Sequence, residues 1–448
     1  PADAVDGAAQ VINAGLNVRT NFSLPENFIY PLRHAISEGK ISMQTIDSRV
    51  ADVLRVKFMM GLFDNPYKGD TKKLEKVVHC KEHQNVSMRA ALESIVLLKN
   101  ENNILPLSKS IKKVAVIGPN AAEVDNLICR YGPANAPIKT VYQGIKDYLP
   151  DSEVRYAKGA DIIDEYFPES ELYDVPLNKT EETMIDEAVA LAKESDVAIM
   201  VLGGNEKTVR EEYSRTNLDL CGRQEKLLQA VYATGKPVIL VMIDGRAATI
   251  NWAERYIPGI VHAWFPGEFM GDAIAKVIFG DYNPGGKLAV TFPRSVGQIP
   301  FAFPFKPGSD SKGFVRVTGS LYPFGYGLSY TTFDYSALKI ENPVIGTQGS
   351  VKLSCRVKNT GKIAGDEVVQ LYLHDEVSSV TTYVKVLRGF ERIHLQPGEE
   401  KVVDFVLTPQ DMGLWNKDNH FIVEPGTFAV MVGSSSQDIR LQGKFEVK

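Results

Sequence analysis

Three glutamates and two arginines gather in residues 203–215, GGNEKTVREEYSR: Glu206, Glu211, Glu212, Arg210 and Arg215. A carboxylic acid that is held partly away from water has a raised pKa and can donate a proton near neutral pH, whereas a neighbouring arginine lowers that pKa. The segment therefore contains candidate groups for general acid–base chemistry. Charged loops are also commonly solvated and paired among themselves, and the residue types alone leave both interpretations open.

This charged segment follows a predicted buried strand. Val197–Leu202 is a continuous apolar run that ends at Gly203-Gly204, which is typical of a strand inside a parallel sheet. Similar runs occur at 113–118, 236–244 and 259–265, and helical patterns lie between them, for example at 181–194 and 224–233. The alternation of strand and helix predicts an α/β domain with a doubly wound parallel sheet and helices on both faces.

The loops that follow these strands are expected to converge, because ligands collect beyond the carboxyl ends of parallel strands. The loops are 118–123, 203–215, 244–249 and 266–271, and we expect their polar groups to share a pocket. Four aromatic residues lie in or near them: Tyr213, Trp252, Trp264 and Phe265. One or two of these rings could form a platform for a sugar, although packing in the core is the better interpretation of the two tryptophans.

The start of the chain contains too few elements for a domain of its own. We expect a helix at 1–14, a short strand at 16–20 and helices at 26–39 and 44–60, followed by a connector at 61–85 and a helix at 84–99. One strand among helices is typical of the last unit of a larger α/β domain, most simply a barrel. Because the chain opens inside a helical pattern, without an initiator methionine, we expect it to begin in the middle of a domain.

The composition changes near residue 282. Residues up to 334 are rich in glycine, proline and aromatic side chains, and predict a wrapping linker. From 335 to the end, roughly seven short alternating strands separated by turn signals predict a β-sandwich of immunoglobulin or fibronectin type III kind. The predicted domains are 1–75, a barrel remnant with its connector; 76–334, an α/β sandwich domain with its linker; and 335–448, a β-sandwich.

Composition argues against several classes of partner. The 448 residues carry a net charge of −5 with 23% charged residues, which does not favour a nucleic acid or a membrane surface. No run approaches the ~18 apolar residues of a membrane-spanning helix. The four cysteines lack C-x-x-C spacing, and the pair His79 and His83 is more simply a surface pair than a metal site. The strand, glycine and helix around Val116–Ala121 lack G-x-G-x-x-G, so no nucleotide cofactor is expected.

Several longer stretches together resemble glycoside hydrolase family 3, the family of exo-acting β-glucosidases and β-xylosidases. The stretches are DAVDGAAQVINAGLNV, RVADVLRVKFMMGLFDNPY, ESIVLLKNENNILPL, KVAVIGPNA, SRTNLDLCGRQEKLLQAV, FGDYNPGGKLAVTFPRSVGQIP, YPFGYGLSYTTF and VKNTGKIAGDEVVQLYL. The resemblance implies a (β/α)8 barrel, an α/β sandwich and a fibronectin type III-like domain. It also implies that the nucleophilic Asp belongs to an S-D-W-like motif on the barrel, ahead of these stretches. No S-D-W occurs in the chain.

The resemblance assigns the general acid/base to a loop just upstream of SRTNLDL. That position matches Glu211 or Glu212, with Glu206 a weaker third, and we favour Glu211, four residues before Arg215. Arg215 itself is expected to order the loop. The implied mechanism is retaining hydrolysis with carboxyl groups ~5–5.5 Å apart, and it needs no metal or organic cofactor.

The resemblance further places Val18–Phe22 on the rim of the active site, so that Arg19, Asn21 and Tyr213 become candidate substrate-binding residues. It implies a β-linked oligosaccharide or glycoside as substrate, β-glucosidase before β-xylosidase, a separate barrel segment as partner, and secretion or a periplasmic location. A non-catalytic carbohydrate-binding or scaffold protein is the alternative. The oligomeric state stays open, a homo-oligomer included.

Overall fold

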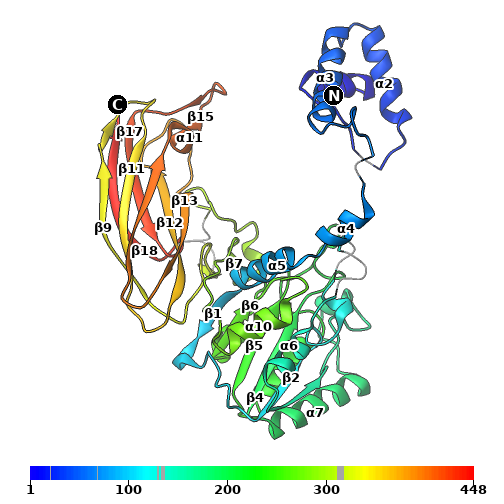
Figure 1. Ribbon diagram of the computed structural model, residues 1–448, viewed down its shortest axis with the longest axis vertical. Coiled ribbons are helices and arrows are strands. Elements are labelled where there is room, and N and C mark those ends of the chain that lie inside the picture. Colours follow the sequence, from blue (N-terminus) through cyan, green and yellow to red (C-terminus); the bar gives the residue numbers. More distant parts are fainter. Residues whose placement is uncertain (21, 68, 129–130, 133–136, 310–316) are drawn as a thin grey trace. The chain divides into compact units, whose positions relative to one another are not determined.

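The computed structural model describes residues 1–448 except 21, 68, 129–130, 133–136 and 310–316. The chain forms two compact units, unit 1 (Pro1–His83) and unit 2 (Gln84–Lys448) (Figure 1). Among the described residues, no helix combines the length and apolarity needed to cross a membrane.

The first unit is helical. It contains α1 (Ala4–Asn13), α2 (Glu26–Ser37), α3 (Met43–Met59) and α4 (Thr71–Val77), and α5 (Lys81–Ser94) begins at its end. The first three helices agree with the prediction. Side-chain caps begin two of them, since Asp3 accepts a hydrogen bond from the backbone of Asp6 and Ser42 from that of Thr45.

The strand predicted at 16–20 is wrong, because these residues have no strand conformation in the structure. A strand persists only where its backbone N–H and C=O groups find a partner, and the described part of unit 1 contains no other strand. The small core of the unit is formed by the helices alone, through Ala9, Ile12, Ala35 and Ile41. The assignment of this unit to a barrel therefore stays a prediction.

Unit 2 contains the predicted parallel sheet. Its strand order is β1-β6-β5-β4-β2-β3, and all neighbours are parallel except β1 and β6. The four predicted strands are confirmed as β2 (Lys113–Ile117), β4 (Val197–Gly203), β5 (Val238–Ile243) and β6 (Gly259–His262). Two edge strands were not predicted, β1 (Val96–Asn100) and β3 (Glu153–Ala157). The helix predicted at 84–99 ends at Ser94, because the apolar residues beyond it pair with the edge of the sheet at β6.

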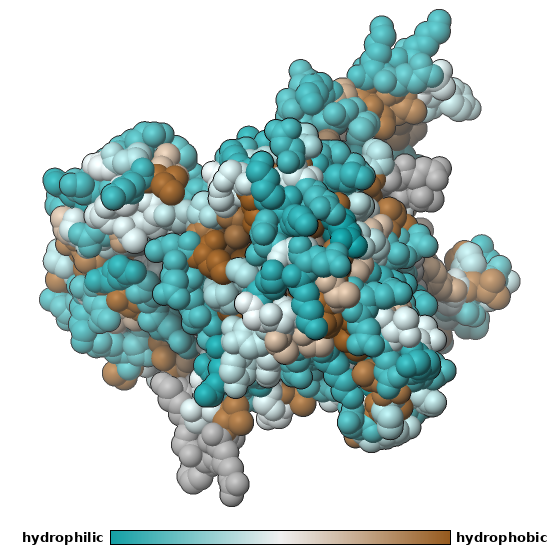
Figure 2. Space-filling model, turned by 90° about the horizontal axis from the view of Figure 1, so that it is seen from below, coloured by the Kyte–Doolittle hydropathy of each residue, from teal (hydrophilic) through white to brown (hydrophobic). Residues whose placement is uncertain are grey.

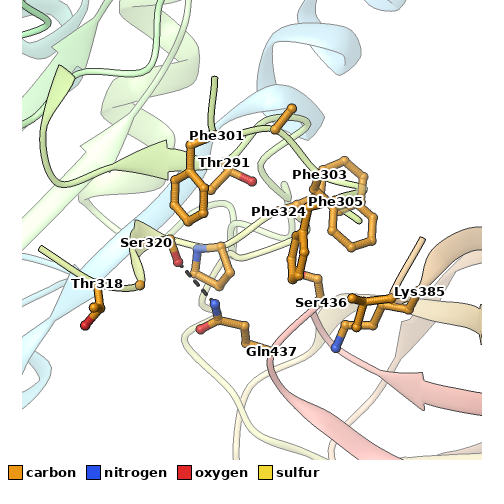
Figure 3. A pocket seen from close by; sticks show the side chains of 14 residues that line it. Thr291, Phe301, Phe303, Phe305, Thr318, Ser320, Phe324, Lys385, Ser436 and Gln437 are labelled. Atoms are coloured by element: carbon orange, nitrogen blue, oxygen red, sulfur yellow. Dashed lines mark hydrogen bonds between the residues drawn. The ribbon is translucent and has the colours of Figure 1, made fainter. Parts of the chain in front are cut away.

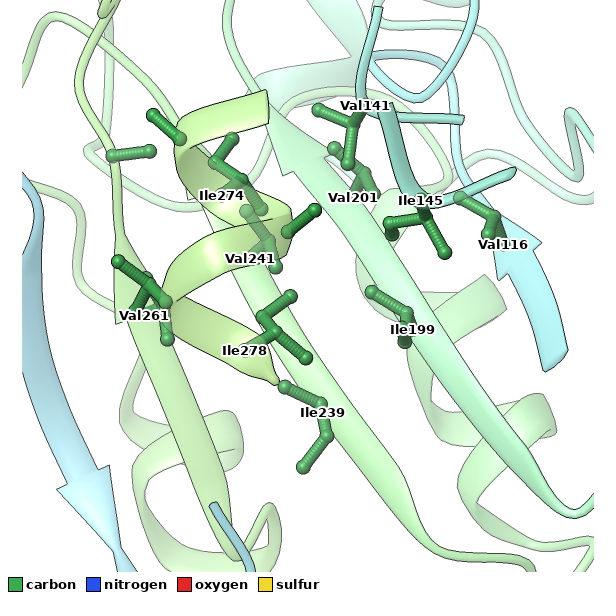
Figure 4. Close-up of a cluster of buried hydrophobic side chains, with 14 of the residues drawn as sticks. Val116, Val141, Ile145, Ile199, Val201, Ile239, Val241, Val261, Ile274 and Ile278 are labelled. Carbon is green, nitrogen blue, oxygen red and sulfur yellow. The ribbon is translucent and has the colours of Figure 1, made fainter. Parts of the chain in front are cut away.

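Helices cover both faces of the sheet, as the alternation predicts. In β4, Ile199 and Val201 belong to one core, with α6 (Val141–Tyr148) and α10 (Met270–Ile278), and Figure 4 shows these side chains between strands and helices. Met200 and Leu202 belong to the opposite core, with α7 (Lys179–Glu194), α8 (Gln224–Tyr232) and α9 (Asn251–Tyr256). Because strand side chains alternate between faces, one apolar run serves both cores.

Two glycines let α6 and α10 approach closely. A Cβ on Gly144 would lie 2.2 Å from the backbone carbonyl carbon of Gly271, so any larger residue would push these helices apart. Short 3-10 helices complete the connections, at Glu101–Asn103, Val124–Asn126, Glu169–Glu171 and Val296–Gln298.

The chain then passes through β7 (Phe292–Pro293) and β8 (Ser320–Tyr322) into a β-sandwich. One sheet has the order β10-β18-β17-β12-β13 and the other β14-β11-β9. The remaining elements are β9 (Phe333–Glu341), β10 (Val344–Ile345), β11 (Val351–Asn359), β12 (Gly365–Asp375), β13 (Val386–Leu395), β14 (Glu400–Leu407), α11 (Pro409–Met412), β15 (Leu414–Trp415), β16 (Phe421–Ile422), β17 (Gly426–Gly433) and β18 (Ile439–Val447). The predicted β-sandwich is confirmed.

On the face shown in Figure 2 hydrophilic residues form most of the surface, and apolar residues appear in scattered groups. This distribution suits a chain in which 23% of the residues are charged.

His262 makes the α/β domain sensitive to acid. It is fully buried at the end of β6, its ring lies edge-on to Trp264 with centroids 4.2 Å apart, and neither ring nitrogen has a hydrogen-bond partner among the described residues. Burial lowers the pKa of His262 to about 3. Below about pH 6.5 the unfolded chain takes up a proton here that the folded protein does not, so the free energy of unfolding falls as the pH is lowered toward 3, by up to roughly 5 kcal/mol.

We therefore expect His262→Met, which retains an apolar side chain of similar size, to reduce the loss of stability between pH 6.5 and 3. Urea unfolding followed by circular dichroism at several pH values measures this loss, with His420→Gln as control, since His420 is exposed. An equally steep loss in His262→Met and in the unaltered chain would contradict the assignment.

Candidate active site

Three of the four predicted loops meet at the carboxyl edge of the sheet. The side chain of Asn120, in the loop after β2, is fully buried and donates hydrogen bonds to the carbonyl oxygens of Gly204 (2.9 Å) and Ile243 (3.3 Å). It thereby joins the ends of β2, β4 and β5. The fourth loop contacts the start of α6, where Lys139 donates its backbone N–H to the carbonyl oxygen of Glu268 (2.9 Å). The shared pocket stays a prediction.

The 203–215 loop is anchored where it leaves β4. Gln224, on α8, accepts a hydrogen bond from the backbone N–H of Gly203 and donates one to its carbonyl oxygen, both at 2.8 Å. Gly203 has a φ of 144° and a Cβ there would lie 1.9 Å from the carbonyl oxygen of Ile243, so only glycine fits. Asn205 and Thr208 close the next turn through a hydrogen bond of 3.0 Å. The first third of the loop is therefore fixed.

A buried ion pair anchors the other end of the loop. Arg215 pairs with Glu171, and their side chains are only 6% and 5% exposed. Glu171 also accepts hydrogen bonds from the backbone N–H (3.0 Å) and the hydroxyl (2.9 Å) of Thr216. Arg215 donates a further hydrogen bond to the carbonyl oxygen of Asp219 at 2.9 Å. These contacts are those of a residue that orders the loop, which is the role expected for Arg215 from the sequence.

Arg246 holds the tip of the loop. Its Nη2 donates hydrogen bonds to the carbonyl oxygens of Arg210 (3.3 Å) and Tyr213 (2.7 Å), which flank the two glutamates. The guanidinium of Arg210 lies over the ring of Tyr213, 3.9 Å from its centroid. Glu212 adopts a left-handed backbone with a φ of 71°, uncommon for a residue other than glycine. The tip is therefore a tight turn whose backbone is held by the side chain of Arg246.

The three candidate glutamates have different surroundings. Glu206 pairs with Arg210 (Nη1 to Oε1, 3.5 Å) and is partly buried. Glu211 and Glu212 are exposed at the tip, and the hydroxyl of Tyr131 donates a hydrogen bond to Glu211 Oε2 at 2.7 Å. Glu206 is therefore engaged within the loop, whereas the tip presents Glu211 and Glu212 to the solvent.

Asp244 is a buried acid that the sequence did not single out. It follows β5, is 6% exposed, and accepts a hydrogen bond from the backbone N–H of Arg246 at 3.0 Å. Burial is the main cause that raises the pKa of Asp244, to about 6, and nearby donors and arginines oppose it. Asp244 therefore shapes the turn that positions Arg246. The one sequence feature that could have identified Asp244 is its position directly after an apolar strand.

The four aromatic residues near the loops fall into two groups, packed and exposed, as the sequence predicts. Trp252 packs against Tyr232 and Tyr256, with ring centroids 5.4 and 5.0 Å away, and Trp264 packs against His262. Phe265 and Tyr213 are 38% and 42% exposed. The tryptophans are parts of the core, and Phe265 and Tyr213 stay available for a ligand.

Two candidate substrate-binding residues belong to the start of the chain. Arg19 is in unit 1, where its guanidinium lies 4.9 Å from the centre of the Phe28 ring. Asn21 lies outside the described residues. No group of three or more His, Cys, Asp or Glu side chains in the described part of the chain is placed to hold a metal ion.

A cavity of unit 2 is separate from these loops. Figure 3 shows this cavity, about 450 Å³ in volume, which is lined by Phe301, Phe303 and Phe324 of the linker and by residues of the β-sandwich. Gln437 donates a hydrogen bond to Ser320 across it at 3.3 Å. No residue of the 203–215 loop lines it.

The buried pair generates a prediction about the order of the loop. We expect Glu171→Gln to lower the free energy of unfolding by about 3–5 kcal/mol and to increase hydrogen exchange in residues 208–220, because Arg215 would remain buried without a counter-charge. The matched control is Glu194→Gln, since Glu194 pairs with Arg155 at an exposed position, where the two side chains are 61% and 51% exposed. Its expected effect is below about 1 kcal/mol. Equal effects of the two substitutions would contradict this role of the pair.

Comparison with known families gives the same architecture. The sequence model of the glycosyl hydrolase family 3 C-terminal domain matches residues 95–330, and that of the fibronectin type III-like domain matches residues 367–436. The first match alone covers more than half of the chain and includes the sheet and the 203–215 loop.

Individual relatives extend the likeness to almost the whole chain. A β-xylosidase of Formosa agariphila is 40% identical over 97% of this chain and 60% of its own length. A periplasmic β-glucosidase of Salmonella typhimurium is 37% identical over 100% of this chain and 61% of its own length. The solved structure of a β-glucosidase from Erythrobacter marinus superposes with a TM-score of 0.88 at 35% identity, again over 100% of this chain and 60% of the other. The chain thus spans about three fifths of the length of these relatives, and it belongs to glycoside hydrolase family 3.

Proposed function

We propose that this chain supplies the acid/base side of a retaining, exo-acting β-glycosidase that releases the terminal non-reducing sugar from β-linked oligosaccharides. The nucleophilic Asp would come from a (β/α)8 barrel outside this sequence. The observation that carries the proposal is the exposed carboxylate Glu211 on a loop that is fixed on both sides, at its exit from β4 and at Arg215. Pre-set loops on a rigid sheet are where catalytic groups are expected.

Glu211 is the preferred acid/base among the three glutamates. Glu206 is tied to Arg210 inside the loop, which leaves Glu211 and Glu212 at the tip. Glu211 lies four residues before Arg215, in the loop to which the family resemblance assigns the acid/base, and the phenol of Tyr131 donates a hydrogen bond to its carboxylate. Glu212 supplies the left-handed turn beside it.

The mechanism then requires two carboxyl groups on opposite sides of the glycosidic bond. The Asp of the barrel attacks the anomeric carbon while Glu211 gives a proton to the leaving oxygen, and Glu211 then takes a proton from the water that releases the sugar. The two carboxyl groups lie about 5–5.5 Å apart in such enzymes. We assign Tyr213, Arg19 and Asn21 to substrate binding.

The first unit supports the idea of a separate barrel segment. Three apolar residues that lie four positions apart on one face of α3 are exposed, Val50, Leu54 and Phe58, by 50%, 39% and 65%. An apolar helix face of this kind is typically covered by another element. We propose that the remaining barrel covers it, which also agrees with the share of the relatives' length that lies outside this chain.

The relatives bear the names of two activities, so both sugars are candidates. The names β-glucosidase and β-xylosidase occur at similar identity, 37% and 40%. We retain the β-glucoside as first choice and the β-xyloside as second, and a panel of 4-nitrophenyl glycosides distinguishes them.

A direct test separates the chain from the complete site. We expect no hydrolysis of 4-nitrophenyl β-glucoside or β-xyloside by residues 1–448 alone, and hydrolysis when the chain is joined to the barrel of its source protein, because the attacking carboxylate lies there. Release of 4-nitrophenol is measured in both cases. Full turnover by the isolated chain would overturn the division of the site.

A second test identifies the proton donor in the barrel-containing protein. In Glu211→Ala, kcat/KM for a disaccharide should fall about 10²–10⁴-fold, since its alcohol leaving group needs a proton. For a 2,4-dinitrophenyl glycoside kcat/KM should change little, because that leaving group departs without one. Added azide, a nucleophile that needs no general base, should raise kcat and yield a β-glycosyl azide.

The matched control is Glu212→Ala, which should show neither the dependence on the leaving group nor the rescue by azide. The same pattern in Glu212→Ala in place of Glu211→Ala would move the role by one residue. Unchanged activity in both variants and in Glu206→Ala would favour the alternative, a binding or scaffold protein.

A further inference from the structure

The β-sandwich has a second cavity, at the end where α11 and the hairpin β15–β16 lie (Figure 1). Its volume is about 470 Å³, within the range of small-ligand sites. Leu373, Met412 and Phe428 form its floor and are at most 3% exposed. The cavity thus opens the apolar core of the sandwich toward the solvent.

Aromatic rings stand around the mouth of this cavity. Trp415 is 65% exposed, Tyr383 43% and Phe421 37%, and all three line the cavity. The rings of Trp415 and Phe421 are 5.5 Å apart at 60°. Phe421 rests on Gly413, where a Cβ would lie 2.4 Å from the ring, so the hairpin carries its rings in a fixed position. Single exposed aromatic residues are ordinary, but three around one cavity indicate a binding surface.

Polar side chains accompany the rings. Arg388 and Gln410 line the cavity, and neither side chain makes a hydrogen bond or ion pair with any described residue. Asp375 also lines the cavity as a half-buried carboxyl group, and its burial raises the pKa of that group. The mouth therefore combines apolar ring faces with a guanidinium, an amide and a carboxyl group.

We propose that this cavity is a carbohydrate-binding site that holds a pyranose ring of a β-linked gluco- or xylo-oligosaccharide, with Trp415 as the stacking platform. A pyranose with equatorial hydroxyl groups has apolar C–H faces that fit an aromatic ring, and its edge needs hydrogen-bonding groups such as those of Arg388 and Gln410. The inference goes beyond the proposed function, since this binding needs neither the barrel nor Glu211.

The composition of the mouth favours a sugar over a protein partner. Aspartate is depleted at the centres of protein interfaces, whereas here Asp375 borders the apolar floor. A cavity of this volume also suits one or two sugar rings better than the flat contact of a second protein.

Isothermal titration of residues 1–448 with cellotetraose, xylotetraose and laminaritetraose tests the proposal. We expect binding of at least one of them with a Kd between about 10 µM and 1 mM. In Trp415→Ala the affinity should fall at least about tenfold, the loss expected for one stacked ring, whereas Trp415→Tyr should retain most of it. Phe390→Ala is the matched control, because Phe390 is 66% exposed on β13 outside the cavity.

The thermal unfolding midpoint of each variant is measured to check that the fold is retained. We expect unchanged midpoints, because the side chain of Trp415 is largely exposed. No binding of any of the three tetrasaccharides up to about 10 mM, or equal affinity of Trp415→Ala and the unaltered chain, would overturn the proposal. A change in the sedimentation coefficient of Trp415→Ala alone would also overturn it, by showing that a second copy covers the cavity. Hydrolysis assays of the barrel-containing protein test the proposed function separately.

Discussion

The ion pair between Glu171 and Arg215 is the contact on which the 203–215 loop most depends. Both side chains are almost fully buried, so each charge is stabilised by the other and by the hydrogen bonds around them, to Thr216 and to the carbonyl oxygen of Asp219. A buried charge that lost its partner would be strongly unfavourable. The pair holds the segment just after Glu211 and Glu212 in place.

The sheet provides the second constraint. Parallel strands bring the loops after β2, β4 and β5 to one edge, and Asn120 connects all three through a buried side chain. Arg246, from the loop after β5, then holds the carbonyl oxygens on both sides of the two glutamates. The carboxylate of Glu211 is consequently presented on a short turn whose backbone is held by groups from neighbouring strands. Such pre-organisation is what proton transfer to a leaving group requires.

Particular residues show how far sequence reasoning reached. The apolar run at Val197–Leu202 and its glycines predicted β4 and the site of the loop, because a buried parallel strand has a strong local pattern. The strand expected at 16–20 was wrong and β1 was missed, since both depend on a partner that lies far away in sequence. Glu171, Tyr131 and Arg246 were also not foreseen. Each of them contacts a loop residue that is more than thirty positions away in the sequence. No local sequence pattern predicts such a contact.

We propose that Glu211 faces the glycosidic bond from the α/β domain. The most direct measurement is a crystal structure of the barrel-containing protein with a thio-linked disaccharide, which binds without being cleaved. We expect the Glu211 carboxyl within hydrogen-bonding distance of the glycosidic sulfur and about 5–5.5 Å from a barrel aspartate on the other side of the sugar. A structure with Glu206, Glu212 or a barrel residue at that place, and Glu211 in solvent, would contradict the account.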